Sequence, residues 1–329
     1  MTRLPVGLMG FGAYLPERIM PNEEWSRYVE TSDAWITSRT GIKRRRVAAP
    51  DESTADLAVA AAQSALQDAG LSAQDVDEII VATDTPEVFT PDTASFVQHR
   101  LGARFVPAYD LGGSGCAGFL QALDIARSRV NAQTRHVLVI GVEVLTRLIN
   151  WHDRNTCVLF GDGAGAALVG AGAGVAEILE AQSGTDGSQA SILWLENGGT
   201  RKPFSLESAK KGDHQKLVMN GRAVFKEAVH HMTEVSKQVL SKAGKSVEEV
   251  ALVVPHQANL RILNAVREAL SLPQEKLYVN IQDYGNTGSA SVGIALWEAR
   301  AKGRIQPGDL VLLTSFGAGF HWAAMLVRF

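Results

Sequence analysis

The sequence FVPAYDLGGSGCAGFLQALDIA, residues 105–126, joins a short apolar segment to a periodic apolar run through small residues and a cysteine. Residues 105–111 predict a strand, residues 112–115 a tight glycine turn, and the spacing from Ala117 onward a helix. A strand, a sharp turn and a helix in this order expose the residue at the turn, here Cys116. A helix start presents unpaired N–H groups and a positive dipole end, so it stabilises a thiolate and can receive an oxyanion. The glycines leave space around the thiol, which favours a reactive cysteine over a buried structural one.

Strand and helix signals alternate on both sides of this stretch. The predicted strands are residues 6–9, 78–82, 137–141, 252–254 and 310–314, with a further apolar run at residues 164–169. The predicted helices are residues 56–68, 93–101, 223–243, 260–270 and 290–302. Such alternation predicts α/β layers with mostly parallel central strands. We expect two similar halves, residues 1–171 and 172–329. Residues 183–213 are rich in glycine, serine and charge, which predicts a long insertion or lid.

The composition is that of an ordinary globular protein. Of 329 residues 46% are hydrophobic and 20% are charged, and the net charge of −3 gives no general attraction to nucleic acid or to a membrane. Two cysteines, Cys116 and Cys157, are too few for a disulfide framework and lack zinc-site spacing. The first ten residues resemble no secretory leader, and no apolar run approaches about 18 residues. We therefore expect a cytoplasmic protein.

Two more polar residues stand where layered α/β proteins form their sites. His256 follows the apolar residues 251–254 through Pro255. An imidazole at the carboxyl end of a strand favours a functional role over a place in the core. Asn286 lies in a glycine-flanked loop, where a turn or N-cap role is an equal alternative. Together with Cys116, these neutral side chains fit acyl transfer through a thioester.

At this point the chain resembles the 3-oxoacyl-ACP synthase III family. The matching motifs are TSDAWI (31–36), RTGI (39–42), CAGF (116–119), FGDGAGA (160–166), PHQANLRI (255–262), GNT (285–287), FGAGF (316–320) and LVRF (326–329). The resemblance implies a homodimer of thiolase-like αβαβα fold and a ping-pong Claisen condensation that starts fatty-acid or polyketide chains. Cys116 would take the acyl group of an acyl-CoA. His256 and Asn286 would stabilise the enolate that forms when malonyl-ACP loses CO2.

The resemblance also assigns the remaining site residues. The oxyanion of the condensation would lie against backbone N–H groups of Cys116 and of the loop Gly317, Ala318 and Gly319. The residues expected to hold coenzyme A are Trp35 and Arg39 on either side of the adenine, Arg154 near it, and Gly221, Phe225, Ala258 and Asn259 along the pantetheine tunnel. An indole and a guanidinium suit such stacking, although Trp35 alone reads as a surface residue, Phe225 as core packing, and the others as a helix start.

Basic residues give two further expectations. Lys226 and Arg261 match the face on which an acidic acyl carrier protein docks, although isolated charges of this kind are usually solvated. The run Lys43 to Arg46 meets the CoA phosphates or forms a solvated basic turn. Apart from the CoA thioester as substrate, neither a cofactor nor a metal is expected.

The sequence departs from the family pattern at two places. Asp110 to Cys116 spans six positions, one more than expected, and glycines replace a run usually dominated by alanine. The turn should therefore be looser. Thr90 falls where several members place a phenylalanine that crosses the dimer interface and floors the acyl pocket. The smaller side chain predicts a deeper pocket and tolerance of primers longer or bulkier than acetyl.

Three other functions, two of them enzymatic, are alternatives to condensation. A relative could transfer the acyl group to a small-molecule hydroxyl or amine, where an enolate-stabilising Asn286 has less purpose. A degradative thiolase needs a second cysteine near the nucleophile, which Cys157 does not match. A non-catalytic dimer partner would normally lose the nucleophile or its helpers, and this chain keeps all three.

Overall fold

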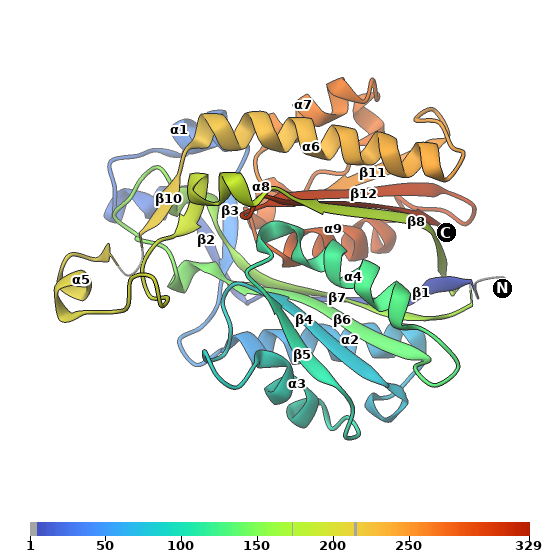
Figure 1. The fold of residues 1–329 in the computed structure, drawn as a ribbon. Helices are drawn as coiled ribbons and strands as arrows, with labels where there is room; N and C mark the ends of the chain where they lie inside the picture. Colours follow the sequence, from blue (N-terminus) through green and yellow to red (C-terminus); the bar gives the residue numbers. More distant parts are fainter. Residues whose placement is uncertain (1–4, 173, 214–215) are drawn as a thin grey trace.

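The computed structural model describes residues 5–172, 174–213 and 216–329, so residues 1–4, part of the stretch considered as a leader, lie outside it. Within these ranges nine strands form one sheet, in the order β11-β12-β13-β8-β1-β7-β6-β4-β5 (Figure 1). These strands are β1 (Val6–Tyr14), β4 (Glu78–Thr83), β5 (Ala108–Gly112), β6 (His136–Val144), β7 (Asp162–Ala171), β8 (Ala176–Thr185), β11 (Val250–Pro255), β12 (Leu310–Gly317) and β13 (His321–Arg328).

Helices cover both outer faces of the sheet and fill the space between its two ends (Figure 1). The long helices are α2 (Thr54–Ala69), α3 (Thr93–Leu101), α4 (Gly118–Arg129), α6 (Gly221–Lys242), α7 (Leu260–Ala269) and α9 (Ala290–Ala301). One outer layer is α2 on β1, β6 and β7 with α3 on β5; the other is α6 on β8, β12 and β13 with α7 beside it. Helices α4 and α9 lie between, since each contacts strands from both ends of the sheet. The predicted αβαβα layering is confirmed.

The prediction of mostly parallel strands is wrong for the middle of the sheet. β4 pairs in parallel with β5 and β6, and β11 with β12, but every pair from β12 through β13, β8, β1 and β7 to β6 is antiparallel. Two of these antiparallel pairs, β1 with β7 and β6 with β7, join segments that were predicted, because β7 runs against both of its neighbours. The other three involve β8 and β13, which the predicted strands omit. Residues 183–185, assigned to the insertion, are the end of β8.

The insertion after β8 begins at residue 186 and is partly regular. It contains β9 (Leu193–Leu195) and the short helix α5 (Leu206–Lys210), which projects from the body of the molecule (Figure 1). β9 pairs antiparallel with β10 (Leu217–Met219) to form a separate two-stranded ribbon. The predicted lid therefore contains one strand of this ribbon and the exposed arm that lies, in sequence, between its two strands.

Near the N-terminus, smaller elements position the motifs of residues 31–46. They are β2 (Arg18–Pro21), α1 (Asp33–Thr40) and β3 (Arg44–Val47), with α8 (Ile281–Tyr284) packed on β3. Arg45 is fully buried, and its guanidinium donates to the Asn22 side chain at 2.9 Å and to the Val158 carbonyl at 2.8 Å. Neither expectation for the basic run, CoA phosphates or a solvated turn, holds at Arg45, because the side chain is buried and both terminal nitrogens already donate to protein acceptors.

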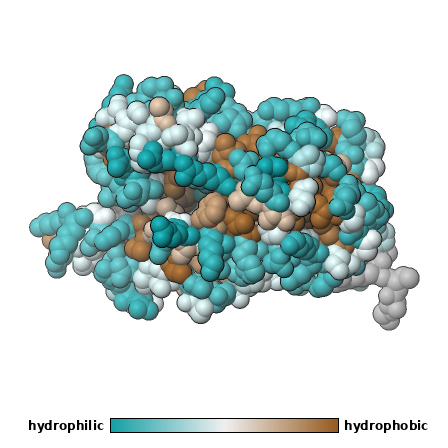
Figure 2. Space-filling view, turned by 90° about the horizontal axis from the view of Figure 1, so that it is seen from above, coloured by the Kyte–Doolittle hydropathy of each residue, from teal (hydrophilic) through white to brown (hydrophobic). Residues whose placement is uncertain are grey.

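The surface is mixed in character. Figure 2 shows a face with many hydrophilic residues and a group of hydrophobic residues near its middle. Among the described helices none is long and apolar enough to cross a membrane. The division of the chain at residue 171 stays a prediction.

Candidate active site

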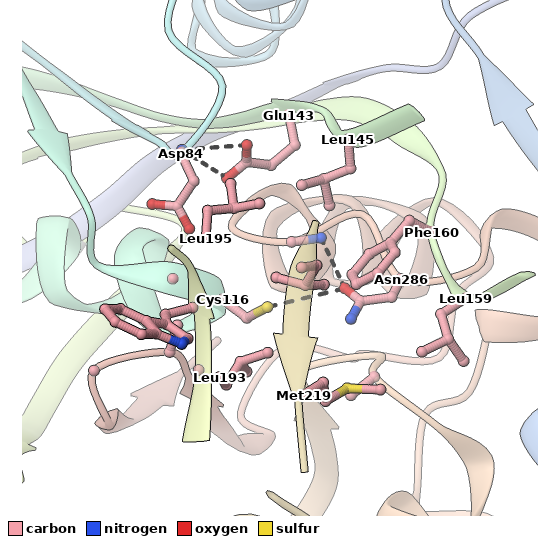
Figure 3. A pocket seen from close by; sticks show the side chains of 18 of the residues that line it. Asp84, Cys116, Glu143, Leu145, Leu159, Phe160, Leu193, Leu195, Met219 and Asn286 are labelled. Atoms are coloured by element: carbon pink, nitrogen blue, oxygen red, sulfur yellow. Dashed lines mark hydrogen bonds between the residues drawn. The ribbon is translucent and has the colours of Figure 1, made fainter. Parts of the chain in front are cut away.

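One cavity of about 1160 Å³ brings together the three residues that the sequence singled out. Cys116, His256 and Asn286 all line it, and Figure 3 shows the first and last of these facing each other across it. Their positions follow from the fold: Cys116 precedes α4, His256 follows β11, and Asn286 lies in the loop before α9. The carboxyl ends of β4, β5 and β11 meet here, as in other layered α/β proteins.

The glycine turn places Cys116 just before the central helix. Gly115–Ala117 forms one 3-10 turn, and α4 begins at Gly118, one residue later than the predicted start. Gly113 and Gly115 have φ of +70° and +56°, which side-chain-bearing residues rarely adopt. The thiol therefore lies at the end of the helix dipole rather than inside the helix.

The electrostatic surroundings of Cys116 differ from the expectation of a stabilised thiolate. Burial raises the pKa of the Cys116 thiol, and the nearby carboxyls of Asp84 and Glu143 raise it further. The hydrogen bond with Asn286 acts in the opposite direction but is the smaller effect. In the free protein the thiol form is therefore favoured.

Asn286 is held so that its amide donor is free. Its Oδ1 accepts the N–H of Gly288 at 2.9 Å and lies 4.0 Å from Cys116 Sγ. Its backbone pairs with Leu159 and Gly161 across the base of the loop. Among the described residues Nδ2 has no acceptor, so it can donate to a ligand. The N-cap alternative is wrong, because Ser289 occupies that position on α9.

His256 is neutral and its ring is oriented by a serine. Burial lowers the pKa of His256 to about 3. Its Nδ1 lies 2.5 Å from Oγ of Ser291, and that Oγ also lies 3.4 Å from the donating N–H of Gln257. With Oγ accepting from Gln257, its hydroxyl can donate to Nδ1, which places the ring proton on Nε2. His256 then offers a second neutral donor.

The loop between β12 and β13 packs against the nucleophile. Gly317, Ala318 and Gly319 line the cavity, and a Cβ on Gly317 would lie 2.3 Å from the backbone N of Cys116. Only glycine permits this approach. The backbone of this loop thus lies against that of Cys116. The oxyanion site itself stays a prediction.

Most residues expected to contact CoA border the same cavity. They are Arg39, Gly221, Phe225, Ala258 and Asn259. Phe225 is 39% exposed, so it is not core packing. Asn259 caps α7, as the alternative held, but its Nδ2 also donates to the Arg39 carbonyl.

Trp35 and Arg154 lie beside the cavity rather than in its wall. The Arg39 and Arg154 guanidinium carbons lie 4.4 Å and 4.8 Å from the centre of the Trp35 ring. Two guanidinium groups thus already pack against the indole of Trp35. An adenine can lie between Trp35 and Arg39 only if the Arg39 side chain moves.

The remaining expected residues are spread around the opening. Arg261 lines the cavity and donates to the Ser38 carbonyl, whereas Lys226 is exposed on α6 beside Glu227. Thr90 is exposed, and its hydroxyl donates to the Phe89 carbonyl. Within this chain Thr90 does not border the cavity, and its expected place at the partner's pocket stays a prediction.

Sequence reasoning missed two acids and an apolar wall. Asp84 and Glu143 line the cavity near Cys116 (Figure 3), and their places at the ends of β4 and β6 were a usable signal. The apolar wall comes largely from the β9–β10 ribbon and the loop before β7; its members include Leu145, Leu159, Phe160, Leu193, Leu195, Leu217 and Met219. Among the described residues no group of three or more His, Cys, Asp or Glu side chains could hold a metal ion.

Comparison with known proteins gives a consistent result. Two family models match, 3-oxoacyl-[acyl-carrier-protein (ACP)] synthase III at residues 109–187 and its C-terminal model at residues 240–329. The chain is 47% identical to the beta-ketoacyl-[acyl-carrier-protein] synthase III of Caldanaerobacter subterraneus, over 99% of this chain and 98% of that one.

Solved structures agree with the sequence matches. The 3-oxoacyl-[acyl-carrier-protein] synthase III of Aquifex aeolicus superposes with a TM-score of 0.90 at 44% identity, covering 98% of this chain and all of the other. The priming beta-ketosynthase of the R1128 polyketide pathway gives 0.89 at 35% identity, covering 99% and 96%.

Proposed function

The chain belongs to the 3-oxoacyl-[acyl-carrier-protein] synthase III family of acyltransferases, and we propose that it condenses an acyl-CoA primer with malonyl-ACP to 3-oxoacyl-ACP, CoA and CO2. The observation that supports this most is the pairing of one thiol with two neutral donors in one cavity. Cys116 Sγ lies 4.0 Å from the Asn286 side chain, and His256 lines the same space.

The first step is acylation of the thiol. Cys116 Sγ attacks the thioester carbon of the primer, the bond to the CoA sulfur breaks, and CoA leaves with the proton that Cys116 gives up. Because the thiol form is favoured in the free protein, Cys116 gives up this proton only as it attacks the bound thioester. The resulting acyl-enzyme is neutral, so its formation removes the cost of a buried thiolate.

The second step needs donors rather than a base. When malonyl-ACP loses CO2, the electron pair of the broken C–C bond moves onto the thioester oxygen. His256 Nε2–H and Asn286 Nδ2–H donate to this oxygen as charge develops there. A histidine that is neutral at physiological pH suits the task, because it stabilises the enolate without first giving it a proton.

The third step joins the two substrates. The enolate carbon attacks the Cys116 thioester, and the oxyanion lies against backbone N–H groups of Cys116 and of the Gly317–Gly319 loop. Collapse of this intermediate releases 3-oxoacyl-ACP and the thiolate, which takes a proton from solution. Neither a metal nor an organic cofactor enters any of these steps.

Binding of the substrates rests on the residues around the opening. We place the adenine of CoA at Trp35 and Arg39 with Arg154 nearby, after Arg39 leaves the indole face. Acyl carrier protein docks on Lys226 and Arg261. The apolar wall supports primers longer than acetyl. The homodimer and the cytoplasmic location stay predictions.

Intact-mass spectrometry of Cys116 adducts over a panel of acyl-CoAs, followed by a malonyl-ACP chase, tests this function. The proposal expects an adduct with at least one primer longer than acetyl, and its consumption by malonyl-ACP with release of CO2. Consumption by an alcohol or amine acceptor, without CO2, would instead support the small-molecule acyltransferase. Failure to form any adduct would revive the non-catalytic dimer partner.

A further inference from the structure

One arginine of the basic run, Arg45 on β3, has no part in the three steps above. Its side chain is fully buried, and among the described residues the oxygens that accept from its guanidinium are all neutral. Burying a charge is unfavourable, and replacing buried charged groups by well-packed apolar ones is often neutral or stabilising. The guanidinium therefore points to a role in position rather than in stability.

The guanidinium of Arg45 joins two separate segments of the chain. Its Nη1 donates to the Met20 carbonyl at 3.3 Å and to the Asn22 side chain at 2.9 Å, at the end of β2 and just after it. Its Nη2 donates to the Val158 carbonyl at 2.8 Å. The guanidinium carbon also lies 5.5 Å from the centre of the Trp25 ring. A rigid, planar fork of donors can hold both segments at once.

The segment that begins at Val158 holds the backbone of Asn286. The Leu159 carbonyl accepts the Asn286 N–H at 2.8 Å, and the Gly161 N–H donates to the Asn286 carbonyl at 3.0 Å. Asn286 is thus paired in parallel with residue 160, although neither belongs to a strand. Because Val158 directly precedes Leu159, the bond from Arg45 fixes the end of the segment that positions Asn286.

Close packing transmits a shift of this segment to the loop. A Cβ on Gly161 would lie 2.3 Å from the Tyr284 carbonyl oxygen and 3.0 Å from Arg45 Cβ. A Cβ on Gly285 would lie 2.9 Å from the Leu159 carbonyl oxygen and 3.6 Å from Arg45 Cβ. The stem of Arg45 therefore lies against both chains where they pair. No space is left there to absorb a movement, so a displaced residue 158 displaces Asn286.

The nucleophile is positioned by other contacts. Cys116 lies between the glycine turn and α4, and Gly317 packs on its backbone N. The hydrogen bonds of Arg45 go to residues 20, 22 and 158 instead. Loss of these bonds should therefore affect the step that uses Asn286 more than the step that uses the thiol.

We propose that Arg45 is a positioning residue for Asn286. By tying residues 158–161 to the end of β2, its guanidinium keeps Asn286 Nδ2 directed at the thioester oxygen on which charge develops during decarboxylation. Arg45 itself touches no substrate. This inference rests on the proposed role of Asn286 in the second step.

Two substitutions at Arg45 and one at its neighbour test the proposal. Arg45→Met keeps an unbranched apolar stem and removes every donor. Arg45→Lys keeps the charge, but its single nitrogen cannot reach both segments. Arg46→Met is the matched control on the same strand, because the Arg46 guanidinium donates to the carbonyls of Pro16 and Glu17 and not to residue 158.

The two half-reactions are measured separately, at saturating acyl-CoA and then with malonyl-ACP added to the acylated protein. For Arg45→Met we expect acylation within about threefold of wild type and a second stage at least about tenfold slower, because a donor displaced from the reacting oxygen loses most of its effect. For Arg45→Lys we expect the second stage to slow about three- to tenfold. Arg46→Met should change neither stage more than about twofold.

A double variant shows whether Arg45 acts through Asn286. If it does, adding Arg45→Met to Asn286→Ala should slow the second stage by no more than about twofold beyond Asn286→Ala alone. A general disturbance of the site would instead multiply the two losses. This readout does not depend on how far either substitution lowers the stability of the fold.

Equal losses in both stages, or multiplied losses in the double variant, would overturn the proposal. If Arg45→Met does not fold, Arg45→Lys carries the test, and a second stage at the wild-type rate in Arg45→Lys would show that bridging the two segments is not needed. Failure of the proposed condensation is seen separately, in a wild-type protein whose Cys116 adduct malonyl-ACP does not consume.

Discussion

The cavity has two walls of opposite electrostatic character. Around Cys116 the chain forms a glycine turn beside two buried carboxyls. Burial, and to a smaller extent these acids, raises the pKa of the Cys116 thiol. Around His256 and Asn286 the side chains are neutral, and each has a named partner, Ser291 or Gly288, that fixes its orientation. At the first wall Cys116 loses its proton and forms the thioester bond, whereas the second wall only donates hydrogen bonds. The difference suggests that the two halves of a ping-pong reaction are assigned to different walls.

Removing the thiol should separate the walls most completely. Cys116→Ala should abolish the acyl-enzyme and all 3-oxoacyl-ACP formation, since no other nucleophile stands in its place. Decarboxylation of malonyl-ACP should persist, because His256 and Asn286 are untouched. Product analysis by mass spectrometry, with CO2 release measured in parallel, checks both. If Cys116→Ala still forms an acyl-enzyme, the nucleophile is misassigned.

The pH dependence of the two half-reactions should differ. With the pKa of His256 lowered to about 3, the imidazole is already neutral from pH 5 upward, so decarboxylation should be flat between pH 5 and 8. The pKa of the thiol is raised, so its thiolate fraction, and with it the acylation rate, should rise by up to about tenfold per pH unit over that range. Single-turnover rates of each step in Cys116→Ala and in wild type test the contrast. Decarboxylation that falls as pH rises through 6 or 7 would mean that a protonated His256 is required.

Loss of the serine that orients the His256 imidazole should have a smaller effect than loss of the thiol. Ser291→Ala removes the partner of His256 Nδ1 and should slow decarboxylation about five- to tenfold, the value of roughly 1 kcal/mol in the transition state, while acylation stays within about twofold. Ser236→Ala, at a buried serine of α6 whose hydroxyl has no partner among the described residues, is the control and should change neither rate. Equal losses in both half-reactions would indicate a general disturbance of the site.

The sequence predicted the residues that stand at boundaries between elements. Cys116, His256 and Asn286 each follow a strand or precede a helix, and such places can be found from glycines, prolines and apolar periodicity. β8 and β13 were missed because the first is half-exposed with an irregular pattern and the second is a short apolar run, which periodicity alone does not assign to a strand.

What could not be predicted depends on contacts between distant segments. Asp84 and Glu143 lie side by side only because of the register of β4 and β6, and neither has a neighbour in sequence that suggests a pair. Arg45 looks like part of a solvated basic run, yet its acceptors come from Met20, Asn22 and Val158. The raised pKa of Cys116 has the same origin, since the helix start is visible in sequence, whereas the burial of the thiol and the nearby acids are not.

The separation of the two walls is tested most directly by Asn286→Ala in a two-stage experiment. The variant is first acylated with an acyl-CoA and the Cys116 adduct is quantified by intact mass; malonyl-ACP is then added and loss of the adduct is followed with CO2 release. We expect acylation close to wild type and a loss of about 10²- to 10³-fold in the second stage, the usual effect of removing one donor to a developing oxyanion. Loss of acylation in a correctly folded Asn286→Ala, or consumption of the adduct at the wild-type rate, would contradict the account.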